Sequence, residues 1–215
     1  MTELVSIPSP GVALEYGDRG APLVVVVHDW FGRLPGLEFF AEALSKKGFR
    51  VLVPDLYNGV ATTDEAAAHR LFTELDVATA LATIDDTIRV GRAEGSKKVG
   101  LVGFSVGGWL MLLHAQNGSA DAVVAYYASL EPSDHGIIPA PVLMHLAEID
   151  EWGAGQEPGR FIDRLKTHGT PISTFTYLGT RHNFANATIR DRLDARAAAL
   201  AFARTALFLD EHLHA

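Results

Sequence analysis

The chain of 215 residues contains no cysteine, and this absence excludes several kinds of chemistry at once. Without thiols there is no disulfide framework, no cysteine-ligated zinc site and no thiolate nucleophile. The sequence also lacks an uninterrupted run of about 18 apolar residues, the length that a membrane-spanning helix needs. Residues 1–8 show no basic stretch followed by a long apolar one, so we expect no signal peptide and a cytoplasmic protein.

Positive charge is also scarce. The chain has 18 lysine and arginine residues against 26 acidic ones, a formal net charge of -8, and the basic residues are scattered along it. Nucleic acids and anionic membranes bind to clustered basic surfaces. We therefore expect no nucleic-acid partner and no membrane partner, and a small molecule is the expected ligand.

The rest of the composition is that of an ordinary globular protein, with 48% hydrophobic and 20% charged residues. The length suits a single α/β domain that buries a large sheet. No internal repeat and no low-complexity linker divides the sequence. We expect one domain over residues 1–215, present as a monomer or a homodimer.

Short apolar runs alternate with helix-like segments along most of the chain. Buried strands are predicted at 23–28, 50–54, 98–104, 122–127, 141–147 and 172–177. Helices are predicted at 37–47, 109–116, 161–168 and 189–212, with two helices or a bent one within 64–92. Segments 4–7 and 12–16 are predicted to form an opening antiparallel hairpin. This order predicts an α/β fold with a mostly parallel central sheet and helices on both faces.

A serine framed by glycines separates one predicted strand from the helix that follows it. Residues 103–108 read Gly-Phe-Ser-Val-Gly-Gly, the pattern of a nucleophile elbow around Ser105. A side chain at Gly103 or Gly107 would collide with the crossing backbone, and the strained turn directs the serine hydroxyl outward. A plain glycine-rich connector between strand and helix is the alternative interpretation.

A serine nucleophile needs a base, and the base needs an acid that orients it. In an α/β-hydrolase the acid and then the histidine follow the nucleophile, each just past the C-terminal end of a strand. Asp150 and His182 occupy such positions, with Glu148 as the nearest rival of Asp150. A loop or cap carboxylate is the alternative interpretation of Asp150. His28 and His145 lie in apolar strands, where hydrogen-bonded core histidines are the better interpretation.

The strand at 23–28 leads into a loop that is expected to shape the site. The backbone N–H of Trp30 is the candidate for one oxyanion donor, and that of Val106 for the other. Asp29 either lines the pocket beside the serine or caps the turn. Arg33 and Arg181 are candidates to bind an anionic group, with solvated surface as the alternative. The expected pocket residues besides Asp29 are Phe31, Trp109, Trp152, Arg181 and Phe184.

Several of these segments together carry a resemblance to a known family. They are residues 102–108, Val-Pro-Asp-Leu-Tyr at 53–57, Trp-Phe-Gly at 30–32, Asp150, and His-Asn-Phe-Ala at 182–185. In this order the chain resembles the dienelactone hydrolase family of α/β-hydrolases, from about residue 23 to the C-terminal helix. The resemblance implies a hydrolase that needs no cofactor or metal and opens esters or lactones through a covalent acyl-enzyme.

Two departures from that family's pattern limit the resemblance. The family's typical nucleophile is cysteine with a glutamate near it, whereas the matching positions here carry Ser105 and Asp29. Arginines hold a substrate carboxylate in its type members, but Asn186 stands near one such position and residues 62–66 contain no arginine. We therefore expect a serine esterase or lactonase with a Ser-His-Asp triad, and dienelactone itself is not the expected substrate.

Two other functions are compatible with the same residues. One is a protein that binds a small molecule on this fold with little or no catalysis, because fold alone does not fix function. The other is acyl transfer or perhydrolysis, in which the triad passes the acyl group to an acceptor other than water. Covalent labelling of the serine and product analysis discriminate between these hypotheses.

Overall fold

A computed structural model describes residues 4–151 and 157–214, and its central feature is a seven-stranded sheet. The strand order is β1-β3-β2-β4-β5-β6-β7, and every neighbouring pair is parallel except β1 and β3. The mostly parallel sheet predicted from the sequence is thereby confirmed. The strands are β1 (Leu14–Tyr16), β2 (Leu23–Val27), β3 (Arg50–Val53), β4 (Val99–Phe104), β5 (Ala122–Tyr126), β6 (Val142–Ile149) and β7 (Ile172–Arg181).

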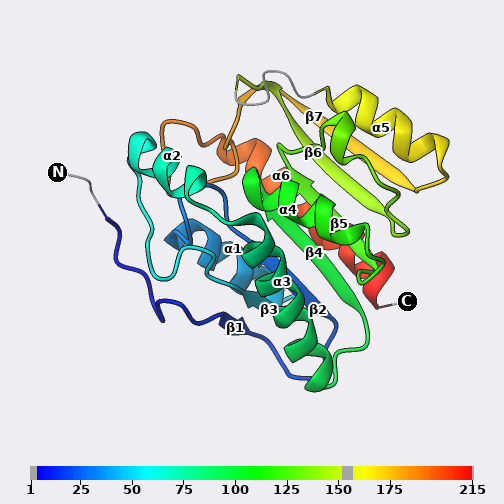
Figure 1. The fold of residues 1–215 in the computed structure, drawn as a ribbon, viewed down its shortest axis with the longest axis horizontal. Helices are drawn as coiled ribbons and strands as arrows, with labels where there is room; N and C mark the ends of the chain where they lie inside the picture. Colours follow the sequence, from blue (N-terminus) through cyan, green and yellow to red (C-terminus); the bar gives the residue numbers. More distant parts are fainter. Residues whose placement is uncertain (1–3, 152–156, 215) are drawn as a thin grey trace.

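Helices cover both faces of this sheet. Figure 1 shows α3 and α4 in front of the strands, with α1 and α6 behind them. None of the helices in the described part of the chain has the length and apolar character that a membrane span requires. The helices are α1 (Pro35–Ser45), α2 (Glu65–Thr73), α3 (Val77–Ala93), α4 (Val106–Ala115), α5 (Pro158–Thr167) and α6 (Ala195–Leu213), with a 3₁₀ turn η1 (Pro132–Asp134).

The central strands are buried on both faces, which explains their continuous apolar sequences. In β2, Val24 and Val26 face the core layer under α1 and α6, whereas Leu23, Val25 and Val27 face the layer under α3 and α4. Successive side chains of a strand point to opposite faces, so one run of valines serves two cores. Burying both faces holds the strand ends, and the loops that leave them, in fixed places.

The predicted bend within 64–92 is a break between two helices. Asp64 caps α2 by accepting a hydrogen bond from the backbone N–H of Ala67, and Asp76 caps α3 in the same way from Thr79. An aspartate at the N-cap satisfies a backbone donor that has no partner inside the helix. The two caps therefore explain why the apolar periodicity of this region does not continue as one helix.

The N-terminal segment is antiparallel, as predicted, but its pairing partners differ from the prediction. Strand β1 pairs with β3, and Leu4 forms an isolated antiparallel bridge with Thr62, so the two predicted strands do not pair with each other. The turn between them is bound elsewhere, because the Arg33 guanidinium donates to the carbonyl oxygens of Pro8 and Ser9. These bonds hold the turn against the sheet and prevent a local hairpin.

Two helix boundaries also differ from the sequence prediction. Helix α6 begins at Ala195 instead of residue 189, because Asp194 accepts a hydrogen bond from the backbone N–H of Ala197 and sets its first turn. Helix α4 begins at Val106, immediately after the serine, so it includes two glycines that favour no helix on their own. Packing of this turn overrides their propensity.

The turn from β4 into α4 leaves no space for side chains at its glycines. A Cβ atom built on Gly103 would lie 2.3 Å from the carbonyl oxygen of Gly107, and one on Gly107 would lie 2.4 Å from the carbonyl oxygen of His28. Both neighbours are backbone atoms, which cannot move without shifting β2 or α4. The glycines at these positions are therefore required by the close approach of the two chains.

We expect Gly107→Ala to lower the free energy of unfolding by about 3 kcal/mol, because overpacking against backbone forces α4 away from β2. Gly159→Ala in α5 is the matched control, since a Cβ atom there meets no atom within 4 Å. That change is expected to raise stability by up to about 1 kcal/mol. Urea unfolding measures both changes, provided that the m-value, the dependence of the free energy of unfolding on urea concentration, stays the same. A Gly107→Ala protein as stable as wild type would contradict this packing.

Candidate active site

Strand register brings two of the predicted site residues together. Strands β6 and β7 are parallel neighbours, and Ile149 at the end of β6 pairs with Arg181 at the end of β7. The next residues are Asp150 and His182, so each leaves its strand at the same point of the sheet edge. The register is shifted between Ala147 and Ile149, and this irregularity sets which residues meet there.

Ser105 reaches the same edge from β4. Its backbone angles, φ 52° and ψ -117°, are sparsely populated for a residue with a side chain. The backbone N–H of Ser105 donates to the carbonyl oxygen of Tyr126 on β5 (2.9 Å), and its own carbonyl oxygen accepts from Trp109 in α4 (2.9 Å). The residue is thus held between strand and helix, in the geometry of an elbow.

The three side chains form a continuous chain of hydrogen bonds. Ser105 Oγ lies 2.7 Å from Nε2 of His182, and Nδ1 of His182 lies 2.8 and 2.9 Å from the two carboxylate oxygens of Asp150. A carboxylate only accepts, so Nδ1 carries the proton and Nε2 accepts the serine proton. The imidazole is therefore oriented with its basic nitrogen at the hydroxyl.

A cavity of about 490 Å³ opens beside this chain of hydrogen bonds. Trp30 and Val106, whose backbone N–H groups are the predicted oxyanion donors, both line it together with Ser105. Val106 is the first residue of α4, where backbone N–H groups have no partner inside the helix and the helix dipole is positive. The cavity is lined by Trp30, His69, Phe72, Ser105, Val106, Trp109, Tyr127, Ala128, Glu131, Asp134 and His182.

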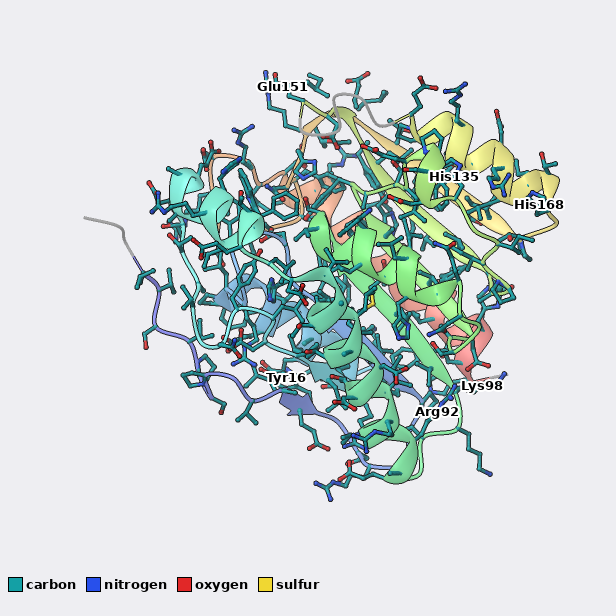
Figure 2. The ribbon with its side chains drawn as sticks, in the orientation of Figure 1. Tyr16, Arg92, Lys98, His135, Glu151 and His168 are labelled. Carbon is teal, nitrogen blue, oxygen red and sulfur yellow. The ribbon has the colours of Figure 1, made fainter. Side chains whose placement is uncertain are left out.

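The other predicted pocket residues fall in different places. Trp109 lines the cavity, whereas Phe31 and Phe184 are buried in the cores and do not line it. Arg181 also does not line it; its exposed guanidinium pairs with Glu151 at 3.0 Å. Figure 2 shows Glu151 at the edge of the molecule where β6 ends. Trp152 lies outside the described residues.

Arg33 was predicted either to bind an anionic group or to lie on the solvated surface. The structure corrects both interpretations, because the side chain neither lines the cavity nor lies in solvent. Its side chain is fully buried, and its guanidinium donates to the carbonyl oxygens of Val12 (2.6 Å) and Val53 (3.3 Å) as well as to those of the N-terminal turn. Backbone carbonyls bind a guanidinium through its several fixed donors. Arg33 therefore joins segments of the fold and is not available to a substrate.

Asp29 caps the turn after β2. One carboxylate oxygen accepts from the backbone N–H of Phe31 (3.0 Å) and the other from the side-chain amide of Asn186 (2.8 Å). It lines a separate cavity of about 20 Å³ and does not face the larger one that contains Ser105. Burial raises the pKa of Asp29 to about 6, although the hydrogen bonds from Asn186 and Phe31 oppose the shift.

The two strand histidines are buried and hydrogen-bonded, as the sequence predicts. His28 accepts through Nε2 from the backbone N–H of Leu56 (3.2 Å), so its Nδ1 donates to the carbonyl oxygen of Asp29 (2.6 Å). His145 contacts the hydroxyls of Thr205 and Tyr177. Burial lowers the pKa of both histidines, and that of His145 falls to about 3. Both rings are therefore neutral parts of the core at physiological pH.

Comparison of the sequence with known proteins assigns this chain to a family. A sequence profile of the dienelactone hydrolase family matches residues 12–213. The chain belongs to the dienelactone hydrolase family. Membership makes it a hydrolase with the α/β-hydrolase fold.

Curated proteins and solved structures are similar to this member of the dienelactone hydrolase family over most of their length. "Protein usf" of Aquifex pyrophilus is 28% identical over 207 residues, 90% of each chain. The carboxymethylenebutenolidase of Pseudomonas putida is 28% identical over 204 residues, 88% of this chain and 85% of that one. Among solved structures, a dienelactone hydrolase-like promiscuous phosphotriesterase from metagenomic libraries has a TM-score of 0.78 at 21% identity, covering 89% of this chain and 86% of that one.

Some residues of this dienelactone hydrolase family member reach the cavity without a signal in the sequence. Tyr127 has a positive φ of 39°, is buried, and lies with its ring centroid 4.9 Å from that of His182. His69 and Phe72 come from α2. Register places Tyr127 beside Ser105, because Phe104 pairs with Tyr126, but nothing in the sequence alone fixes that register.

Candidate metal ligands do not converge within residues 4–151 and 157–214, where no group of three or more histidine, aspartate or glutamate side chains is arranged to hold an ion. The hydroxyl of Ser105, the imidazole of His182 and the carboxylate of Asp150 are instead hydrogen-bonded to one another. The chemistry available at this site is that of a hydroxyl, an imidazole, a carboxylate and backbone N–H groups.

The raised pKa of Asp29 gives a test of its burial. The folded-state pKa, about 6, exceeds the ordinary value of 3.8, so the contribution to stability is complete below pH 3.8 and is lost as pH rises through 6. The free energy of unfolding of wild type minus that of Asp29→Asn is expected to fall by on the order of 3 kcal/mol between about pH 4 and pH 7.

Asp76→Asn provides a control of opposite sign. The hydrogen bonds from Thr79 hold the pKa of Asp76 below its ordinary value, so Asp76 contributes stability that is lost as pH falls. Chemical denaturation at several pH values measures both differences. A difference for Asp29→Asn that is flat between pH 4 and pH 7, or that rises, would show that this carboxyl group is not held in an environment that disfavours its charge.

Proposed function

We propose that this protein hydrolyses small carboxylic esters or lactones, with the chain acting as one domain and Ser105 as the nucleophile. The observation that carries the proposal is the 2.7 Å contact between Ser105 Oγ and Nε2 of His182, in a wall of the 490 Å³ cavity. Family membership supports the same conclusion. The name of the Pseudomonas putida relative, carboxymethylenebutenolidase, supports a lactone or ester as the substrate class.

The first half of the proposed reaction forms an acyl-enzyme. His182 takes the proton of Ser105 while Oγ attacks the carbonyl carbon, and the carbonyl π electrons move onto oxygen. Asp150 holds Nδ1–H of His182 and stabilises the imidazolium that forms. Collapse of the tetrahedral intermediate breaks the bond to the leaving oxygen, which receives the proton from His182. In a lactone this oxygen stays attached to the acyl chain.

The oxyanion of that intermediate needs donors on the opposite side of the carbonyl from the nucleophile's base. The backbone N–H groups of Val106 and Trp30 are the proposed donors, since both residues line the cavity next to Ser105. Donors fixed by a helix start and a strand end need no reorganisation when the charge develops, and each contributes a factor of about 10² to 10³ in rate.

The second half of the reaction uses water. His182 removes a proton from a water molecule that attacks the acyl carbon, and a second tetrahedral intermediate forms at the same donors. Its collapse breaks the bond to Ser105 Oγ, to which His182 returns the proton. The carboxylic acid leaves and the enzyme is restored. The whole cycle, as proposed, uses side chains, backbone N–H groups and water.

Removal of the nucleophile is the direct test. Ser105→Ala is expected to lower kcat for p-nitrophenyl acetate by a factor of about 10⁶, because the three side chains act as a unit. Ser45→Ala is the matched control and should retain full activity, because Ser45 is a half-buried serine at the end of α1 whose hydroxyl donates to the backbone carbonyl of Glu42. Ester hydrolysis undiminished in Ser105→Ala would overturn the proposal.

Covalent labelling separates an enzyme from a protein that only binds its ligand. A fluorophosphonate is expected to add one adduct to wild type and none to Ser105→Ala, since the reagent needs an activated serine. Intact-protein mass spectrometry measures the adduct. Tight binding of esters without labelling would support the binding protein instead.

The choice of acid is tested by a pair of variants. Asp150→Asn is expected to lower kcat by a factor of about 10⁴, because the amide favours the wrong tautomer of His182. Glu148→Gln should leave kcat nearly unchanged, because Glu148 is exposed and accepts a hydrogen bond from the backbone of Gly179. Steady-state kinetics with p-nitrophenyl acetate compares them, and the reverse order would assign the acid to Glu148.

A further inference from the structure

The walls of the cavity beside Ser105 carry charge of one sign. Glu131 and Asp134 line it, from the segment that follows β5, and among the described residues that line it there is no lysine and no arginine. Glu131 is exposed and Asp134 is half-buried, so both carboxylates are in contact with solvent. A ligand in this cavity therefore meets a negative potential, in a chain whose formal net charge is -8.

Two arginines near this part of the molecule are bound elsewhere. Arg164 on α5 donates to the carbonyl oxygen of His135 in the same segment, but it does not line the cavity. Arg181 is paired with Glu151 beyond the rim. The other titratable groups on the walls are two imidazoles and the phenol of Tyr127, and the imidazole of His182 is already bound to Asp150.

The remaining walls are aromatic. Trp30 and Trp109 line the cavity with Phe72 and Tyr127, and Trp30 makes an edge contact with His69 at 6.4 Å between ring centroids. Aromatic faces attract cations through their quadrupole, tryptophan most strongly, and they also accept uncharged apolar groups. They do not offer the paired N–H donors with which an arginine side chain binds a carboxylate.

We propose that this cavity selects esters whose non-reacting group is positively charged or uncharged, and discriminates against esters that carry a carboxylate. The inference rests on the proposed function, because it assigns the charge class of the substrate at the same site. The two carboxylates act on the charge of the ligand, and the aromatic rings line the same cavity. An alkylammonium group is attracted by the carboxylates and by the aromatic rings, and an uncharged alkyl group packs on the rings alone. A carboxylate is repelled by the two carboxylates and gains no cation–π attraction from the rings.

The test compares three thioesters that differ in charge. They are acetylthiocholine, its uncharged isostere with tert-butyl in place of trimethylammonium, and S-acetyl mercaptopropionate, which is anionic. A disulfide reagent reports the released thiol, and it cannot react with the protein because the chain has no cysteine. The assay runs at about pH 8, where an ordinary imidazole is neutral.

We expect kcat/KM to decrease from the cationic to the uncharged to the anionic thioester, with about a three- to tenfold preference for the cation over its isostere. In the double variant Glu131→Gln with Asp134→Asn, the ratio of cation to isostere should fall toward one and turnover of the anion should rise. Asp163→Asn, an exposed carboxylate on α5 away from the cavity, is the matched control and should keep the wild-type ratios. A preference for the anion, or ratios that the double variant leaves unchanged, would overturn the charge assignment.

A binding measurement keeps this inference separate from the chemistry. Phenyltrimethylammonium should quench tryptophan fluorescence at lower concentration than phenylacetate does, because Trp30 and Trp109 line the cavity. That preference should shrink in the double carboxylate variant, to the part that the aromatic rings alone contribute. Equal binding of the two probes would overturn the charge assignment even in an active enzyme, whereas cation binding without Ser105-dependent turnover would remove the proposed function and retain the charge preference.

Discussion

The alignment of parallel strand ends is the constraint on which the site depends. Ile149 pairs with Arg181 and Phe104 pairs with Tyr126, so the residues that follow each pair leave the sheet at matching heights. A slip of one residue would turn each strand's side chains to the opposite face, at the cost of both cores. The hydrophobic burial that stabilises the sheet therefore also fixes the distance between hydroxyl and imidazole to within a hydrogen bond.

Two carboxylates in different surroundings act on His182. Asp150 is partly exposed and binds the imidazole directly, whereas Asp29 is buried and bound by a backbone N–H and the amide of Asn186. Asp29 lies near enough to His182 that a positive charge on the imidazole lowers the pKa of Asp29, against the larger effect of burial. A proton on His182 therefore interacts with the carboxylate of Asp150 through a hydrogen bond and with that of Asp29 through space.

The sequence predicted the parallel sheet, the elbow and the positions of Asp150 and His182, because each follows from local patterns: apolar runs, glycines that permit a strained turn, and polar residues just past strand ends. It did not predict what depends on distant contacts. The role of Arg33 depends on carbonyls brought from the N-terminal turn, and the place of Tyr127 depends on register. The aromatic side chains divided between core and cavity for the same reason. Phe31 and Trp109 pack in the same core layer, but Phe31 is fully buried whereas Trp109 is partly exposed and lines the cavity.

The burial of Arg33 links the start of the described chain to the loop that carries Trp30. Its guanidinium donates hydrogen bonds to the backbone carbonyl oxygens of Pro8, Ser9 and Val12, and none of these three residues belongs to a helix or a strand. If these residues were trimmed away, a fixed positive charge would remain in the interior with fewer acceptors, and such a charge destabilises its surroundings strongly. The segment before β1 therefore supplies hydrogen-bond acceptors to the loop after β2. Shortening that segment would destabilise this loop, which carries Trp30 in the cavity wall.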